Sequence, residues 1–189
     1  MSTSVLYMSM SFDGYVADAN DFLGGEDGNR LHHWFSPGGG QPAEPARELV
    51  KELDKVGAVV TGRRTAELMD HWGGDVHGGV PIFVPSHRPP GPAARWNYPL
   101  VTYVTDGIKS AMEQAKAAAE GRNVYVQGGY TAQRALEEGV LDELQIHQIP
   151  LLLGGGRRLF DVLASPVELD IVRVIDTPDA THIRYRVRR

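Results

Sequence analysis

Residues 123–139 have the sequence NVYVQGGYTAQRALEEG, which predicts a buried strand, a glycine turn and a helix in one short run. Val124 and Val126 flank Tyr125 in a β-favouring segment, and the two glycines that follow allow a sharp turn. Thr131 can cap the next helix, whose apolar residues recur at helical spacing. A helix N-terminus behind Gly-Gly offers backbone N–H groups to an anion, so the run is either a phosphate site or an ordinary tight turn.

The composition limits the class of protein. The chain has 189 residues, of which 42% are hydrophobic, and this is enough for one well-buried domain over residues 1–189. A net charge of −5 argues against a general nucleic-acid surface, and the absence of cysteine excludes disulfides and thiol nucleophiles. No stretch approaches the roughly 20 apolar residues of a membrane span. We therefore expect a cytoplasmic protein that binds a small molecule, and neither nucleic acid nor membrane.

Strands and helices alternate along most of the chain. Strands are expected at residues 5–10, 57–61, 80–84, 100–104, 123–127 and 144–152, and helices at residues 46–55, 65–71, 105–119 and, as a short cover, 159–163. The final runs, residues 167–175 and 181–187, predict an antiparallel pair. This order predicts an α/β fold with a mainly parallel sheet, and His147 within an apolar strand is expected to be a core or interface histidine.

Residues 22–45 form a long loop rich in glycine and proline. A segment of this length is too long for a simple connection, and such loops often close over ligands. Trp34 lies in an aromatic run within it. Its side chain is expected either to form a wall beside a ligand or to be a hydrophobic plug that fixes the loop.

Three of the expected strands end in glycine or in polar and cationic residues. In chain order these ends are Thr61-Gly62-Arg63-Arg64-Thr65, Ser86-His87-Arg88 and Gln127-Gly128-Gly129-Tyr130-Thr131. Carboxyl ends of neighbouring parallel strands meet at one edge, where α/β proteins bind ligands. The glycines would supply backbone donors to a pyrophosphate, and the arginines, serine and histidine would bind a further phosphate. The combination predicts a phosphorylated dinucleotide, although the Rossmann fingerprint and the P-loop signature are both missing.

Several segments together resemble the dihydrofolate-reductase-like family. They are residues 11–17 (SFDGYVA), 61–65 (TGRRT), 127–129 (QGG), 141–144 (LDEL) and 150–156 (PLLLGGG). The nearest resemblance is to the C-terminal reductase domain of the bifunctional riboflavin-biosynthesis deaminase–reductase and its stand-alone bacterial relatives, over about residues 5–160. It implies a three-layer fold, with a mixed, mainly parallel sheet flanked by helices and a C-terminal antiparallel hairpin. It also implies NADPH as hydride donor and a homodimer, formed through the region around residues 144–156.

The resemblance implies roles for individual residues. The phosphate-binding Gly-Arg-x-Thr falls on Gly62, Arg63 and Thr65, with Thr61 and Arg64 beside it. The adenosine 2′-phosphate loop falls on Ser86, His87 and Arg88. The pyrophosphate turn falls on Gly128 and Gly129, followed by Tyr130 and Thr131. The segment that touches nicotinamide falls on Ser9, Val16 and Ala17.

The substrate side is less defined. Gln127 stands where the riboflavin enzyme has a substrate-contacting glutamate, and Trp34 is the other expected substrate residue. Asp13 is the candidate proton donor, and its alternative role is to cap the turn before Gly14. No metal site is expected. The sequence therefore predicts an NADPH-dependent oxidoreductase that reduces a small heterocyclic or carbonyl-like substrate, resembling 5-amino-6-(5-phosphoribosylamino)uracil reductase of riboflavin biosynthesis. The alternatives are a dihydrofolate reductase-type activity and a nucleotide-binding protein without catalysis.

Overall fold

The computed structural model describes residues 1–20, 26–88, 90 and 98–189. Backbone contacts group the chain into two compact units. The first unit comprises Met1–Leu6 and Asp54–Asp142, and the second comprises Tyr7–Leu53 and Glu143–Arg189.

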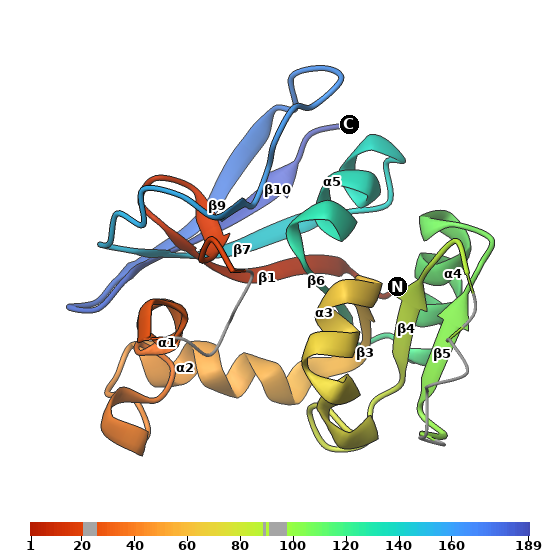
Figure 1. The fold of residues 1–189 in the computed structure, drawn as a ribbon, viewed down its shortest axis with the longest axis horizontal. Helices are drawn as coiled ribbons and strands as arrows, with labels where there is room; N and C mark the ends of the chain where they lie inside the picture. Colours follow the sequence, from red (N-terminus) through yellow and green to blue (C-terminus); the bar gives the residue numbers. More distant parts are fainter. Residues whose placement is uncertain (21–25, 89, 91–97) are drawn as a thin grey trace. The chain divides into compact units, whose positions relative to one another are not determined.

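The elements follow one another as the sequence pattern predicts, in an alternation of strands and helices (Figure 1). The strands are β1 (Ser4–Ser11), β2 (Tyr15–Ala17), β3 (Val56–Thr61), β4 (Ile82–Pro85), β5 (Val101–Val104), β6 (Asn123–Gln127), β7 (Glu143–Ile149), β8 (Arg157–Arg158), β9 (Leu169–Asp176) and β10 (Thr181–Val187). The helices are α1 (Glu26–His32), α2 (Ala46–Lys51), α3 (Arg63–Leu68), α4 (Ile108–Ala118) and α5 (Gly129–Glu137), with 3-10 turns at η1 (Pro37–Gly39), η2 (Glu52–Lys55) and η3 (Asp70–Gly74).

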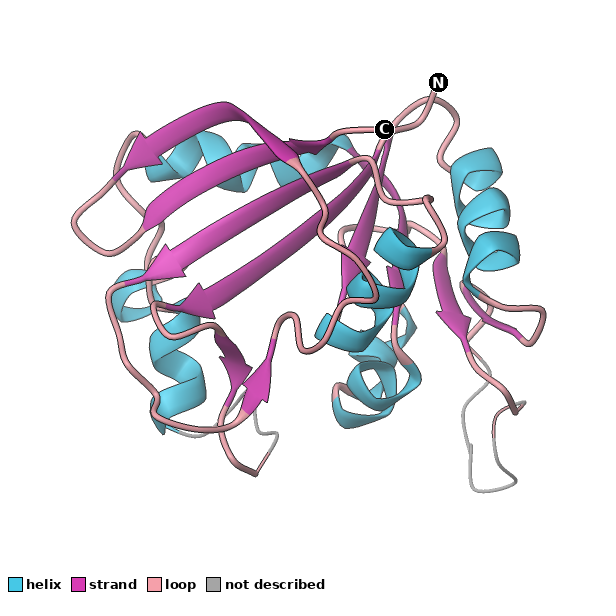
Figure 2. Cartoon of the chain, turned by 90° about the horizontal axis from the view of Figure 1, so that it is seen from above, coloured by secondary structure: helices cyan, strands magenta, loops and turns pink. Residues whose placement is uncertain are grey.

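One large sheet has the strand order β5-β4-β3-β6-β1-β7-β10-β9. Strands β2 and β8 form a separate small sheet, which Figure 2 shows apart from the large one. In the first unit β5, β4, β3, β6 and β1 are all parallel neighbours. Every residue of β3 is buried, as expected of a parallel strand covered on both faces. Helix α4 packs against β3 and β4, and α5 packs against β6.

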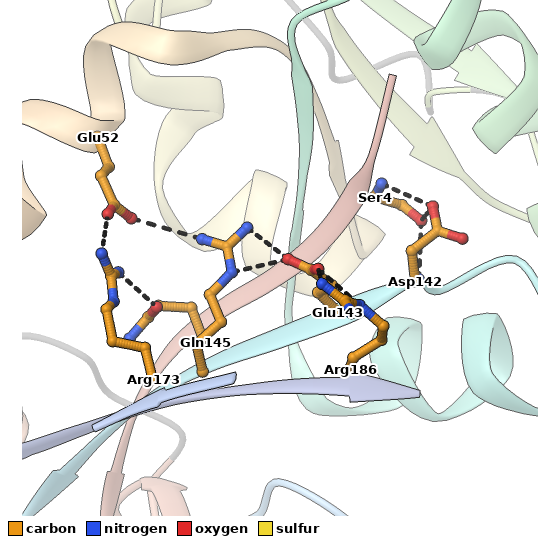
Figure 3. A network of polar contacts seen from close by, with 8 residues as sticks. Ser4, Glu52, Asp142, Glu143, Gln145, Arg173 and Arg186 are labelled. Atoms are coloured by element: carbon orange, nitrogen blue, oxygen red, sulfur yellow. Dashed lines mark hydrogen bonds and ion pairs between the residues drawn. The ribbon is translucent and has the colours of Figure 1, made fainter. Parts of the chain in front are cut away.

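The second unit is built on antiparallel pairing. Strand β10 pairs antiparallel with both β7 and β9. Glu52 forms an ion pair with Arg173 of β9 at 2.6 Å (Figure 3). It also pairs with Arg184 of β10 at 3.4 Å, and Arg184 pairs with Glu143 of β7 at 2.7 Å. Arg184 and Glu52 are only 14% and 16% exposed, so this network is better shielded from water than an ordinary surface pair. The predicted mainly parallel sheet and C-terminal antiparallel hairpin are confirmed.

Some predicted elements are wrong in detail. The predicted helical cover at residues 159–163 has no helix, because Arg157–Arg158 pairs with β2 and the Leu159 N–H donates to the Gly14 carbonyl at 3.0 Å. The predicted helix at residues 65–71 is displaced to Arg63–Leu68, and the chain then enters η3 with positive φ angles.

The segment at residues 22–45 contains more structure than a loop, since α1 and η1 lie within it. Residues 22–25 are outside the described part of the chain. Leu31 at the end of α1 is fully buried in a core with Leu49 and Ile149. Burial of this one face, rather than helix propensity, accounts for a helix in a segment that contains Gly28.

Candidate functional site

Two glycine turns lie side by side at the carboxyl ends of β3 and β6. Thr61 and Gln127 are register partners, so the turns that follow them leave the sheet at the same edge. A Cβ added to Gly62 would lie 2.6 Å from Thr131 Oγ1, and a Cβ on Gly128 would lie 3.2 Å from Thr65 Oγ1. The two turns therefore pack closely against each other, and a side chain at Gly62 would force Thr131 to move.

Helix α5 begins directly after the second turn. Gly128 has a φ of +92°, which a residue with a Cβ rarely adopts. Gly128 is the N-cap and makes no side-chain cap hydrogen bond, so Thr131 lies inside the helix and the predicted threonine cap is wrong. Without a side-chain cap, the amides at the start of this helix are suited to an anion, which the helix dipole also favours.

A cationic cluster lies at the carboxyl end of the neighbouring strand β4. Arg63 Nη1 donates to Ser86 Oγ at 3.5 Å and to the Arg88 carbonyl at 3.4 Å. Ser86 Oγ also donates to that carbonyl at 2.6 Å, which fixes the turn after β4. Arg63 Nε forms an ion pair with Glu67 at 2.7 Å. Arg63 is thus oriented by Glu67 of its own helix and by the turn that follows β4.

Two buried polar atoms sit at the ends of β3 and β6. Gln127 Oε1 and Thr61 Oγ1 are both buried, and neither has a hydrogen-bond partner within the described residues. Burying such a group without a partner costs about 1–3 kcal/mol. A donor to the amide oxygen of Gln127 would have to come from outside the described residues.

In the second unit, Trp34 belongs to the core. It is 3% exposed, and its indole N–H donates to Ser9 Oγ at 2.9 Å. Its ring stacks on His147 with 4.1 Å between ring centroids. Of the two expectations for Trp34, this placement corresponds to the plug rather than the wall, and it occupies the Ser9 hydroxyl as well.

Asp13 also has structural partners. Its carboxylate accepts hydrogen bonds from Ser11 Oγ at 2.6 Å and from the backbone N–H groups of Leu153 and Gly154 at 3.1 and 2.7 Å. The bond from Ser11, together with those backbone bonds, holds the pKa of Asp13 below its ordinary value. An ionised carboxylate is a poor proton donor near neutral pH, so these contacts match the turn-capping role.

The family can be assigned from the whole sequence. Residues 3–183 match the family model described as the RibD C-terminal domain. The chain belongs to this family. No match to a curated protein reaches significance.

Solved structures agree with that assignment. A putative riboflavin biosynthesis protein from Shewanella sp. PV-4 is 26% identical, with a TM-score of 0.78 over 99% of both chains. A pyrimidine reductase-like protein from Corynebacterium diphtheriae is 15% identical, with a TM-score of 0.65 over 100% of this chain and 92% of that one. Dihydrofolate reductase from Enterococcus faecalis, solved with NADP(H), is 14% identical, with a TM-score of 0.60 over 99% and 97%. These likenesses confirm the dihydrofolate-reductase-like fold.

The chain spans only part of a bifunctional relative. It covers 56% of the Thermotoga maritima deaminase/reductase, at 13% identity and a TM-score of 0.64. Membership of the RibD C-terminal domain family implies a reductase-like function. Among the described residues, no helix has the length and apolar character that a membrane crossing needs.

The residues predicted to form the site of this RibD C-terminal domain fall in both units. The first unit brings together, at one sheet edge, Thr61, Gly62, Arg63, Thr65, Ser86, Arg88, Gln127, Gly128, Gly129 and Thr131. Arg64, His87 and Tyr130 are exposed beside them. Ser9, Asp13, Val16, Ala17 and Trp34 belong to the second unit, where all but the partly exposed Asp13 are buried. No group of three or more His, Asp or Glu that could hold a metal occurs in the described ranges.

Sequence reasoning did not find the histidine pair of the second unit. His147 Nδ1 lies 2.7 Å from His182 Nδ1, and His182 Nε2 lies 3.3 Å from Thr177 Oγ1. The Thr177 hydroxyl donates to the Ala180 carbonyl at 2.8 Å, so its oxygen accepts from His182. We therefore assign a proton to His182 Nε2. His147 Nδ1–H then donates to His182. Burial is the main reason that the pKa of His147 falls well below its usual value and the pKa of His182 falls to about 4.

Proposed function

We propose that this chain is an NADPH-dependent reductase that transfers hydride to a small heterocyclic or carbonyl-like substrate, and that it is related in reaction to 5-amino-6-(5-phosphoribosylamino)uracil reductase of riboflavin biosynthesis. The proposal rests on one observation. Two packed glycine turns and the contact between Arg63 and Ser86 lie at the same edge of a parallel sheet. The same edge combines a place for a pyrophosphate with a place for a further phosphate monoester.

The residues present fit the phosphate groups of NADPH. Gly128 places at the edge a helix N-terminus that has no side-chain cap, which suits a pyrophosphate. Arg63 offers a guanidinium whose orientation is already set by Glu67 and Ser86, which suits the 2′-phosphate that distinguishes NADPH from NADH. When bound, the cofactor supplies the hydride. The chain's own contribution is to orient the reactants and exclude water.

Gln127 is the residue that we assign to the substrate. Its buried Oε1 can accept a hydrogen bond, and within the described residues it has no donor. A glutamine cannot carry the charge that a glutamate would, so it suits a neutral N–H group of a heterocycle. The proton that completes the reduction comes from solvent or from a group on the substrate in this proposal, because Asp13 is held ionised by its turn contacts.

A titration tests the cofactor. Nicotinamide fluorescence is followed as NADPH or NADH is added to the protein, and we expect clearly tighter binding of NADPH. Equal binding of the two, or none, would remove the role given to Arg63 and Ser86.

A substrate screen tests the reaction. Oxidation of NADPH is followed at 340 nm with the phosphoribosylaminouracil intermediate, dihydrofolate and simple carbonyl acceptors. We expect turnover with the phosphoribosylaminouracil intermediate, whose uracil ring presents neutral N–H groups. Turnover with dihydrofolate alone would favour the folate alternative, and tight NADPH binding without turnover on any acceptor would favour a nucleotide-binding protein without catalysis.

We also propose that the protein is a homodimer. The sequence expectation placed the interface at residues 144–156, but Leu144 and Ile146 of β7 are 2% and 5% exposed and β7 lies between β1 and β10. The exposed apolar side chains Ile171, Val172 and Val174 are instead on the edge strand β9. Light scattering should give the mass of two chains, and Ile171→Lys should lower it. A monomeric mass for the unaltered protein would contradict the dimer.

A further inference from the structure

Residues 70–74 form a left-handed turn directly after α3. Asp70, His71 and Trp72 have φ angles of 44°, 51° and 53°, and Gly73 and Gly74 continue at 65° and 85°. Left-handed backbone is unfavourable for a residue with a Cβ, because the Cβ lies too close to the following carbonyl oxygen. Three such residues in succession persist only where the surrounding contacts hold them, and such places are often ligand clamps.

Two tyrosines hold this turn. Tyr98 packs on Gly74 so closely that a Cβ there would lie 2.4 Å from the Tyr98 ring, and the Tyr98 hydroxyl donates to Asp70 at 3.4 Å. His71 is 2% exposed, and its Nε2 lies 2.9 Å from the Tyr103 hydroxyl. Burial lowers the pKa of His71 and raises the pKa of Tyr103, so both groups are neutral near pH 7. The left-handed turn therefore presents a neutral imidazole to Tyr103.

Tyr103 in turn contacts the cationic cluster. It lies on β5 opposite Val84 of β4, two residues before Ser86. The central carbon of the Arg63 guanidinium lies 5.9 Å from the centre of the Tyr103 ring. This separation is within the range of a cation–π contact. The Tyr103 ring thus restricts the orientations open to the Arg63 guanidinium, whose Nε is already held by Glu67 at 2.7 Å.

We propose that Tyr103, held in place by His71, is a positioning residue that orients Arg63 toward a phosphate monoester on the ligand and so sets the preference for a 2′-phosphorylated dinucleotide. The inference rests on the proposed function. An arginine side chain loses rotamer entropy when a ligand fixes it, and a side chain that is already restricted loses less of it on binding. The effect is therefore specific to the phosphate that Arg63 binds.

The test compares NADP⁺ with NAD⁺ by calorimetry on the full chain. Tyr103→Leu removes the ring, and we expect it to weaken NADP⁺ binding about 3- to 10-fold. Binding of NAD⁺, which lacks the 2′-phosphate, should change less than about twofold, since the remaining contacts are intact.

Conservative variants separate positioning from a general structural role. Tyr103→Phe keeps the ring and loses the hydroxyl that contacts His71, and His71→Asn loses the same contact while Asn tolerates left-handed backbone. Both should weaken NADP⁺ binding less than Tyr103→Leu does. Tyr98→Phe is the matched control, because its hydroxyl bonds Asp70, and it should leave the ratio of the two affinities unchanged.

A second readout needs no cofactor. In a proton–nitrogen correlation NMR spectrum of the free protein, the signal of the Arg63 guanidinium Nε–H should be shifted by the Tyr103 ring current. Its exchange with solvent should be slowed by Glu67. The shift should disappear in Tyr103→Leu and remain in Tyr103→Phe.

The outcomes are distinguishable. If the unaltered protein binds NADP⁺ no better than NAD⁺, the proposed cofactor and this inference are both overturned. If it prefers NADP⁺ and Tyr103→Leu leaves that preference intact, or weakens both ligands equally, only the positioning role is overturned.

Discussion

Arg63 and Arg64 show how much a single residue's environment depends on the helix that carries it. They are adjacent in the sequence and both follow Gly62, so their charge and local position do not distinguish them, although the Gly-Arg-x-Thr resemblance falls on Arg63. Helix α3 begins at Arg63, and successive helical residues point about 100° apart. Arg63 is therefore turned toward Ser86 and the end of β4, whereas Arg64 is exposed.

This difference leads to a prediction for one side chain. Arg63→Ala should weaken NADPH binding about 10- to 100-fold, since hydrogen bonds to charged groups contribute about 1.5–3 kcal/mol. Binding of NADH should change little. Fluorescence titration measures both, with Arg64→Ala as the neighbouring control, for which we expect a smaller loss. Equal losses from the two variants would show that the phosphate is not held by Arg63 in particular.

At the scale of elements, the site depends on two βα turns that exclude side chains. Gly62, in the turn after β3, faces the hydroxyl of Thr131 in α5. Gly128, in the turn after β6, faces the hydroxyl of Thr65 in α3. Each turn thus packs against a threonine of the helix that follows the other turn. The sequence showed the glycines and the threonines as separate local signals. Only the pairing of β3 with β6 shows that they belong to one contact.

Gly128 and Gly139 form a matched pair for testing this arrangement. Both have left-handed φ angles, of 92° and 67°, but a Cβ at Gly139 has nothing within 4 Å. Gly128→Ala and Gly139→Ala should each lower the free energy of unfolding by roughly 1–2 kcal/mol, because each forces a Cβ into left-handed backbone. Urea unfolding measures this loss.

Only Gly128→Ala should also weaken NADPH binding, because its Cβ meets Thr65 Oγ1 at 3.2 Å. If Gly139→Ala weakened NADPH binding as much as Gly128→Ala does, the weaker binding would come from lost stability rather than from the turn.

At the scale of the whole molecule, the buried histidine pair connects folding to pH. His147 and His182 lie on β7 and β10 and are both neutral, since burial lowers the pKa of His182 to about 4 and that of His147 well below its usual value. In the unfolded chain each pKa returns to about 6.5. The unfolded state therefore binds more protons than the folded state at acidic pH, and acidification favours unfolding.

The free energy of unfolding should fall as the pH drops from about 6.5 to about 4, by about 3 kcal/mol for His182 alone. Above about pH 6.5 this pair should contribute no further change. Urea unfolding at several pH values measures the slope, and His182→Gln should flatten it. His87→Gln, at an exposed position, should leave it unchanged. A slope that is the same in His182→Gln as in the unaltered protein would contradict this origin.

The sequence by itself determined the alternation of strands and helices, the mainly parallel sheet with its antiparallel end, and the glycine and arginine signals at three strand ends. These features are carried by hydrophobic periodicity and by short motifs, whose physical causes act within a few residues. Only the tertiary structure decided that Trp34 is buried against His147, that Asp13 caps a turn with Gly154, and that residues 70–74 form a left-handed turn in which His71 contacts Tyr103. Each of these features depends on partners that are 32 to 141 positions away in the chain. Such partners also offset the strain of the left-handed backbone at residues 70–74. No local pattern encodes which distant residue will be the partner.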